Sequence, residues 1–232
     1  MREAAAILRQ QMIDTRKNRA VMIQFLLFPL ITIIMSKTVN IQDMPQNFYL
    51  MLFSVMYLAM APISAMSAII SEEKEKGTLR ALMMSNVSPF SYLLGVGVYV
   101  VSFCLLGTVL MSRICGMSGE EWRRYLALMA IGFLISTFLG AAIGVCAKNQ
   151  MAATSLQVPI MCVLSFLPMI AQFNTTVAKV AKYFYTDQFY HLLVDGKSDK
   201  ISTESLVILA VNGVLILGFF IVAYKKRGLN HE

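Results

Sequence analysis

The chain has 232 residues, of which 57% are hydrophobic and only 14% are charged. Soluble domains carry about 25% charged residues, so this composition excludes an ordinary water-soluble fold. The formal net charge is +7. In so apolar a chain we interpret this charge as a signal of membrane topology, and we expect no nucleic-acid partner.

Six long apolar segments follow one another along the chain, and none contains Asp, Glu, Lys or Arg. A helix needs about 17–25 mostly apolar residues to cross a lipid bilayer, and each segment has that length. The sequence therefore predicts an all-α, polytopic membrane protein with a single transmembrane domain over residues 1–232. The predicted spans are residues 20–36, 48–70, 92–112, 125–147, 152–172 and 205–224.

Residues 3–18, before the first span, predict a short amphipathic helix. Its apolar side chains share one face, with arginines on the other. A basic amphipathic helix next to a span lies in the membrane interface, so we expect an elbow that leads into the bilayer. A disordered basic tail is the alternative. The apolar face consists of Ala4, Ala5, Ile7, Leu8 and Met12, and the polar side carries Arg9 and Arg16.

Both tails are basic, and six spans place them on the same side of the membrane. That side would hold twelve of the twenty Lys and Arg residues. Because Lys and Arg are enriched in cytoplasmic loops, we predict that both termini are cytoplasmic.

Residues 71–91 form a charged loop between the second and third spans. Acidic and basic residues alternate in it until Gly77 interrupts the run, and Thr78 is a favourable N-cap for a short helix. Apolar residues then follow at helical spacing and form one small face. A two-turn helix is unstable in isolation, so we expect it to dock on a surface; a solvated charged loop is the alternative. The acidic residues are Glu72, Glu73 and Glu75, the basic ones Lys74 and Lys76, and the apolar face Leu79, Leu82 and Met83.

Small residues recur every four positions in the fourth predicted span. They are Gly132, Ser136, Gly140 and Gly144. Such a row allows the backbone of a neighbouring helix to approach closely, so we expect a tight helix pair here.

The connection over residues 173–204 is long and carries apolar residues at helical spacing. Three tyrosines, Tyr183, Tyr185 and Tyr190, are interleaved with them. Tyrosine is typical of the headgroup level of a membrane, so we expect this segment at the outer surface. It either lines an exit or shields the end of the bundle from water.

The sequence lacks the residues that ion coupling, nucleotide binding and catalysis would require. Ion-coupled transporters generally bury ionisable side chains in their spans, and the predicted spans have none. The tetrapeptide at 195–198 resembles the end of a phosphate-binding loop, but His191 stands where that motif needs glycine. No catalytic or metal-binding constellation is present, and the four cysteines lie in or near spans, as packing residues do. We therefore expect a chain that is not an enzyme and holds no cofactor or metal of its own.

The charged loop carries a family resemblance. The stretch from Glu72 to Leu79, followed by Leu82 and Val87-Ser88, resembles the coupling-helix signature of ABC-2 type transporter permeases. The layout is similar too, with an elbow, six spans and a long outer loop. Two positions depart from the family pattern: Asn86 stands where proline is frequent, and Val96 where lysine is frequent.

The resemblance implies the permease subunit of an ATP-driven exporter in the bacterial cytoplasmic membrane. Two permease subunits, identical or related, would pair, and each would rest on a separate ATPase subunit that binds ATP and Mg²⁺. The acidic run Glu72, Glu73 and Glu75 would face this ATPase. The short helix that follows Gly77 would insert into a cleft of the ATPase through Thr78, Leu79, Leu82 and Met83.

The cargo is indicated only by composition. The second span holds Met51, Met56, Met60 and Met66, and flexible methionine side chains could form an adaptable apolar path. This favours a hydrophobic or amphipathic cargo, such as a drug, a lipid-like molecule or a peptide. The alternative is that the methionines only fill packing positions.

Two other functions remain open from the sequence. One is a carrier or channel without a motor, and the other is an immunity-type membrane protein that sequesters a peptide. The charged loop favours the exporter, because neither alternative needs a surface for an ATPase.

Overall fold

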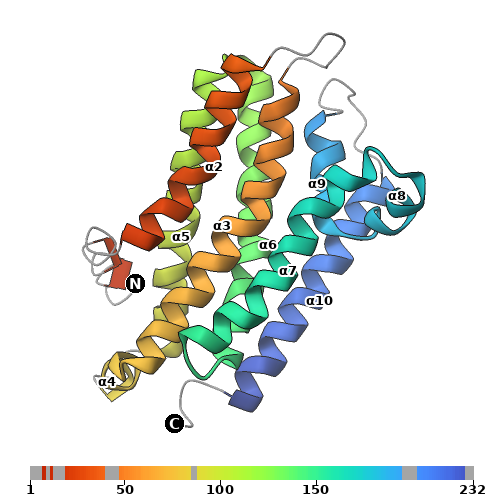
Figure 1. The fold of residues 1–232 in the computed structure, drawn as a ribbon. Coiled ribbons are helices and arrows are strands. Elements are labelled where there is room, and N and C mark those ends of the chain that lie inside the picture. Colours follow the sequence, from red (N-terminus) through yellow and green to blue (C-terminus); the bar gives the residue numbers. More distant parts are fainter. Residues whose placement is uncertain are drawn as a thin grey trace.

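The computed structural model describes residues 7–8, 11–12, 19–39, 47–84, 88–194 and 203–227. Within these ranges every regular element is an α-helix, and the long helices run up and down in one bundle (Figure 1). Five of them are long and apolar enough to cross a membrane. This agrees with the prediction of an all-α membrane protein. The five are α3 (Phe48–Glu75), α5 (Pro89–Ile114), α6 (Gly119–Cys146), α7 (Gln150–Ala171) and α10 (Thr203–Arg227).

The first predicted span corresponds to α2 (Arg19–Thr38). Its apolar part, Phe25–Thr38, is shorter than the five candidate spans. The count of six spans therefore stays a prediction. Of the predicted elbow, only residues 7–8 and 11–12 belong to the described part of the chain, where they are helical. Asn86, Val87 and the 195–198 tetrapeptide lie outside it.

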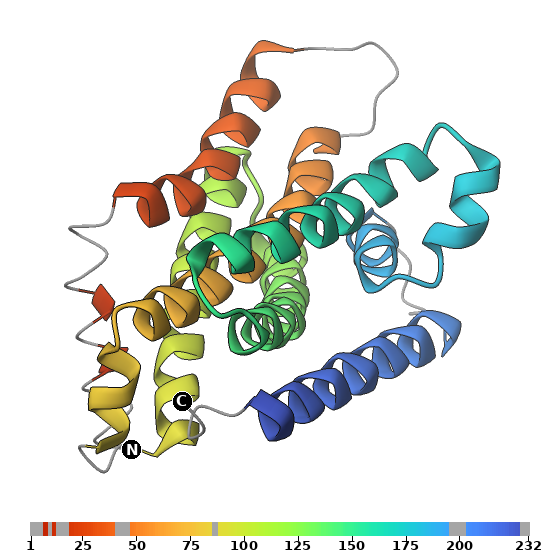
Figure 2. The ribbon, with the colours of Figure 1, turned by 60° about the horizontal axis from the view of Figure 1, so that its bottom comes forward.

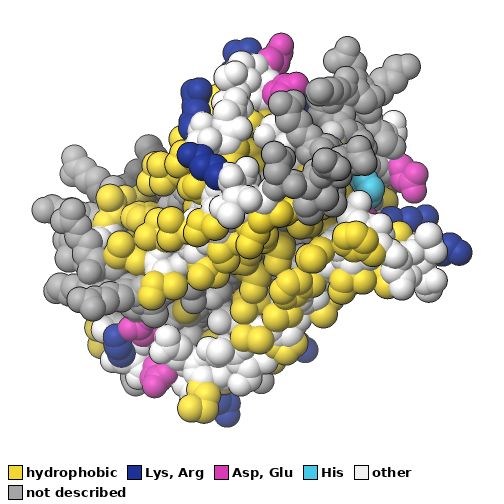
Figure 3. All heavy atoms as spheres, turned by 45° about the horizontal axis from the view of Figure 1, so that its top comes forward, with side chains coloured by type: hydrophobic (Ala, Val, Ile, Leu, Met, Phe, Trp, Pro, Cys, Tyr) yellow, Lys and Arg dark blue, Asp and Glu magenta, His cyan; other side chains and the backbone are white. Residues whose placement is uncertain are grey.

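Hydrophobic side chains form a band across one face of the bundle. Figure 3 shows this band, with Lys, Arg, Asp and Glu side chains gathered above and below it. Such a distribution suits a helix bundle whose middle faces hydrocarbon and whose ends face water.

The central helix of the bundle is α3. Its most apolar 18-residue window is 89% buried, whereas that of α10 is only 6% buried. Helix α3 packs against α2, α5, α6, α7 and α9, whereas α10 packs on α6 and α9 at the edge of the bundle (Figure 2). A helix that is apolar on all sides belongs in a core or in lipid, and these two helices represent the two cases.

The small-residue row of α6 packs closely against another helix, as predicted, and the structure identifies that helix as α3. A Cβ atom added to Gly140 would lie 2.8 Å from the carbonyl oxygen of Ile63, and one added to Gly144 would lie 2.9 Å from the Cβ of Ile70. Ser136, the second member of the row, contacts a different helix: its hydroxyl lies 2.9 Å from the hydroxyl of Tyr185 on α9. The row thus brings α6 close to α3 and also anchors α9.

Two short helices, α8 (Thr175–Ala181) and α9 (Tyr185–Val194), occupy the connection before α10. Tyr185 and Tyr190 of α9 are buried, and only Tyr183 is exposed. Two of the three tyrosines thus pack against protein, and their placement at headgroup level stays a prediction. Burial raises the pKa of Tyr185, so its hydroxyl stays protonated and shares a hydrogen bond with Ser136. Helix α9 covers the end of the bundle.

Candidate functional site

The charged run that was predicted as a loop is the end of a helix. Helix α3 continues through Glu75, five residues beyond the predicted span. Within the run, Glu72 and Lys76 form an ion pair one turn apart, which adds modestly to helix stability. Gly77 then ends the helix with a φ of +68°, a left-handed conformation that favours glycine. The charged side chains are thus held on a rigid extension of the central helix.

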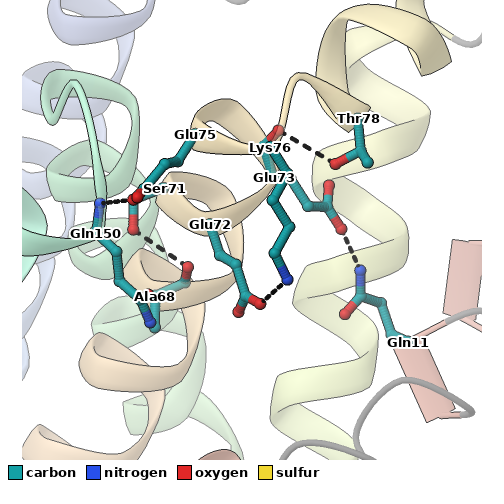
Figure 4. Close-up of polar contacts among 9 residues, drawn as sticks. All are labelled: Gln11, Ala68, Ser71, Glu72, Glu73, Glu75, Lys76, Thr78 and Gln150. Carbon is teal, nitrogen blue, oxygen red and sulfur yellow. Dashed lines mark hydrogen bonds and ion pairs between the residues drawn. The ribbon is translucent and has the colours of Figure 1, made fainter.

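Glu73 ties this extension to two other parts of the chain. Its Oε1 accepts a hydrogen bond of 2.5 Å from the Nε2 of Gln11, in the segment before α2 (Figure 4). Its carboxylate also faces Tyr92, which is fully buried at the start of α5. An acidic residue predicted to face a partner protein therefore makes its described contacts within the chain.

Lys74 and Glu75 hold the turn between α6 and α7. The Nζ of Lys74 donates to the carbonyl oxygens of Val145 and Ala147, at 3.1 and 2.8 Å. The Oε2 of Glu75 accepts a hydrogen bond of 2.9 Å from the backbone N–H of Gln150 (Figure 4). A cation thus lies at the C-terminus of α6 and an anion at the N-terminus of α7. Both positions suit the helix dipoles, so adjacent residues of α3 cap two helices at once.

The short helix α4 (Thr78–Met84) follows immediately. Thr78 is its first residue and not its N-cap, which corrects the prediction. The Gly77 carbonyl accepts the first helical hydrogen bond, from the N–H of Ala81 at 3.3 Å, so Gly77 takes the N-cap position. The Thr78 hydroxyl instead donates to the carbonyl oxygen of Glu73 at 3.1 Å (Figure 4). This contact bends the chain back onto the end of α3.

The apolar face of α4 rests on its own protein. Leu79 is only 4% exposed and belongs to the hydrophobic core, and Leu82 packs partly buried against that core. Thr78, Ala81 and Met84 are exposed, with Met84 at 75%. The prediction that this helix needs a docking surface agrees with the structure, but for Leu79 the surface is inside the chain. The side chain of Met83 is not among those described.

The four methionines of the second predicted span lie along α3. Met56 and Met66 are buried in the core, while Met51 and Met60 pack partly buried against it. Met51 also lines a cavity of about 110 Å³ with Glu121, Arg124 and other residues, at the end of α3 far from α4. These positions agree with a packing role in the single chain, and a role in a path stays a prediction.

No metal site is visible in the described ranges. There, His, Cys, Asp and Glu side chains form no group of three or more that could hold an ion.

The comparison with protein families identifies the chain. A profile of the ABC-2 family transporter proteins matches residues 3–224, so this protein belongs to that family. It is an integral membrane protein and the membrane domain of a transporter, a type of domain that is generally not catalytic. A comparison with curated proteins gives no significant match.

Proposed function

We propose that this protein is the permease subunit of an ATP-driven exporter and that it pairs with a second permease subunit. Each would be driven by a separate ATPase subunit that carries ATP and Mg²⁺. In this proposal α2 is the first of six spans, residues 3–18 form the elbow, and both termini are cytoplasmic. In support, α4, the α6–α7 turn and the C-terminal end of α10 lie at the same end of the bundle (Figure 1).

The main support for the proposal is the set of contacts made by Glu73, Lys74 and Glu75 at the end of α3. An ATPase that pushes on α4 needs a rigid route from α4 into the spans. That route is available because α4 is hydrogen-bonded to the backbone of Glu73. The next two residues, Lys74 and Glu75, form hydrogen bonds with the end of α6 and the start of α7. A displacement of α4 would tilt α3 and would carry the α6–α7 turn with it as a rigid body.

The surface offered to the ATPase is the exposed side of α4. Thr78, Ala81 and Met84 would contact the partner, together with the exposed Lys76 and Gly77. Leu79 and Leu82 would keep α4 seated on the bundle. Glu72, Glu73 and Glu75 would act through their contacts within the chain, and only Glu75, which is exposed, also offers its carboxylate outward.

Co-purification from native membranes in mild detergent tests this proposal. We expect an ATPase in near-stoichiometric amount with the unaltered chain. We expect Met84→Glu to reduce its recovery at least tenfold, because a charge would enter an apolar contact. The matched control is Val180→Glu on α8, an exposed apolar residue at the opposite end of the bundle, which should retain the ATPase.

The same experiment separates the alternative functions. A carrier or channel without a motor, or a membrane protein that sequesters a peptide, would purify without a nucleotide-binding partner. Equal recovery of the ATPase by Met84→Glu and Val180→Glu would contradict the assignment of the α4 surface.

The cargo that we propose is hydrophobic or amphipathic. The absence of charged residues from the predicted spans supports this, since an ionic cargo would need charged partners in the membrane. In nanodiscs that hold the complete complex, amphipathic peptides should stimulate ATP hydrolysis and a polar sugar should not. Stimulation by the sugar alone would contradict the proposed cargo class.

A further inference from the structure

A groove of about 440 Å³ opens between α7 and α10, below α9. Its walls include Pro159 and Val163 of α7, Tyr185 of α9, and Asn212 and Ile216 of α10. An apolar protein cavity of about 150 Å³ is already large enough to bind benzene. This groove is thus large enough for part of an organic molecule.

The groove exists because its two walls pack on different neighbours. Helix α7 packs mainly on the central α3, whereas α10 packs on α6 and α9. Figure 2 shows α10 set apart from α7 at the edge of the bundle. Both helices are candidate spans, so in a bilayer the opening between them would lie at the depth of the hydrocarbon.

The lining of the groove is suited to an apolar occupant. Every lining residue except Asn212 and Tyr185 has a hydrocarbon side chain. The amide nitrogen of Asn212 donates to the carbonyl oxygens of Tyr183 and Ile208, both at 2.9 Å, and the Tyr185 hydroxyl is paired with Ser136. Water in such a groove would find few of the two to four polar partners that a buried water needs.

Two exposed lysines lie on the chain segment that leads into the groove at Phe184. Lys182 is exposed, and its Nζ lies 4.9 Å from the centroid of the Tyr183 ring. The hydrogen bond from the Asn212 amide to the Tyr183 carbonyl oxygen joins this segment to α10. The next residue, Phe184, lines the groove. Lys179, one turn earlier on α8, is exposed as well. Tyrosine and lysine side chains close to the ends of spans are typical anchors at the headgroup level of a membrane, and Lys182 and Tyr183 lie in the connection between two candidate spans.

We propose that this groove binds one phospholipid, with an acyl chain between α7 and α10 and its phosphate beside Lys182. An acyl chain matches the apolar lining, and a phosphate complements the charge of Lys182. The lipid would fill the space that the packing of α7 and α10 leaves open. The proposal concerns this chain alone and does not depend on its partner or its cargo.

Fluorescence quenching by brominated lipid tests the proposal in the purified full-length chain. The chain has one tryptophan, so Trp122→Phe gives a background without indole fluorescence. Phe184→Trp places a reporter in the groove, and Leu106→Trp is the matched control on the exposed, lipid-facing side of α5. Phosphatidylglycerol with bromine on its acyl chains is then added to protein in detergent.

We expect the Phe184→Trp reporter to be quenched at about one lipid per chain and Leu106→Trp only at a much higher ratio. Adding Lys182→Gln should raise the lipid concentration for half-quenching about fivefold, as expected for the loss of one basic residue near a phosphate. Native mass spectrometry of the unaltered chain should show one retained phospholipid, which Val163→Trp should displace.

Equal quenching of both reporters at every ratio would overturn the proposal, since the groove would then hold only bulk lipid or detergent. Quenching of neither reporter, with cross-linking between Val163→Cys copies, would also overturn it. In that case a second permease subunit covers the groove.

Discussion

The two ends of the bundle carry short helices that are held in different ways. At one end α9 is built into the core, with Tyr185 and Phe189 almost completely buried. At the other end α4 buries mainly Leu79, and much of its remaining described surface is exposed. Polar contacts of α3 residues hold this second end together. Apolar burial suits a permanent cover, whereas polar contacts at a helix end suit a surface that a partner can push.

The largest effect on stability is expected from the α9 end. Phe189→Ala removes a fully buried aromatic ring from the core and should reduce the free energy of unfolding by about 3–5 kcal/mol. Unfolding in mixed detergent micelles measures this loss. The exposed Val180→Ala on α8 is the control and should change little. A loss below about 1 kcal/mol for Phe189→Ala would contradict the description of α9 as part of the core.

A smaller and more local effect is expected from Leu79→Ala at the α4 end. The substitution removes the main buried side chain of α4 and should cost about 2–3 kcal/mol at most. Hydrogen exchange should accelerate in α4 and stay unchanged in α9, because a seven-residue helix can open without the rest of the bundle. Faster exchange at both ends would show that the two ends unfold together.

The contacts of α3 with the α6–α7 turn should have a modest effect on stability and a larger effect on coupling. Lys74→Met removes both hydrogen bonds to the C-terminal end of α6, and Glu75→Gln removes the negative charge at the N-terminus of α7, each with an expected cost of about 0.3–1 kcal/mol. If the proposed function holds, ATP hydrolysis should continue in the complex while cargo movement falls.

The control for this pair is Lys148→Gln, which removes an exposed charge from the same turn without touching α3 contacts that the structure shows. Equal loss of transport in this control would mean that the charge of the turn matters and that the α3 contacts do not.

The smallest effect is expected for the ion pair between Lys76 and Glu72. The Lys76 side chain is 63% exposed, and an exposed pair one helical turn apart contributes only about 0.3–0.5 kcal/mol. Lys76→Gln should therefore leave the unfolding midpoint nearly unchanged at high salt. A loss above about 1 kcal/mol would show that the end of α3 depends on this pair more than on its capping contacts.

Periodicity and composition were sufficient to predict the long apolar helices and one of their contacts. The spacing of Gly140 and Gly144 predicted a close helix pair, and the structure identifies α3 as the partner. The resemblance around Gly77 predicted the family to which the chain belongs. These features are local, so a single stretch of sequence carries them.

The partners of the charged side chains could not be predicted in the same way. Lys74 and Glu75 looked like members of an alternating run, and nothing nearby in sequence indicates the carbonyl of Ala147 or the N–H of Gln150 as their partners. The only signal was that a helix ends and another begins near residue 148, which leaves backbone groups in need of caps. The partner of Leu79 could not be predicted for a related reason, since a helical face does not reveal which protein covers it, and in the structure its own chain covers it.

The sequence by itself determined that the chain is a helical membrane protein, because bilayer thickness and backbone hydrogen bonding leave an apolar chain few other solutions. It also determined that the charged run is interrupted at Gly77, which readily adopts the left-handed conformation found there. Only the tertiary structure decided that α3 is central, that Leu79 is internal and that α7 and α10 stand apart. Those outcomes depend on how side chains distant in sequence pack together, and no local pattern encodes that packing.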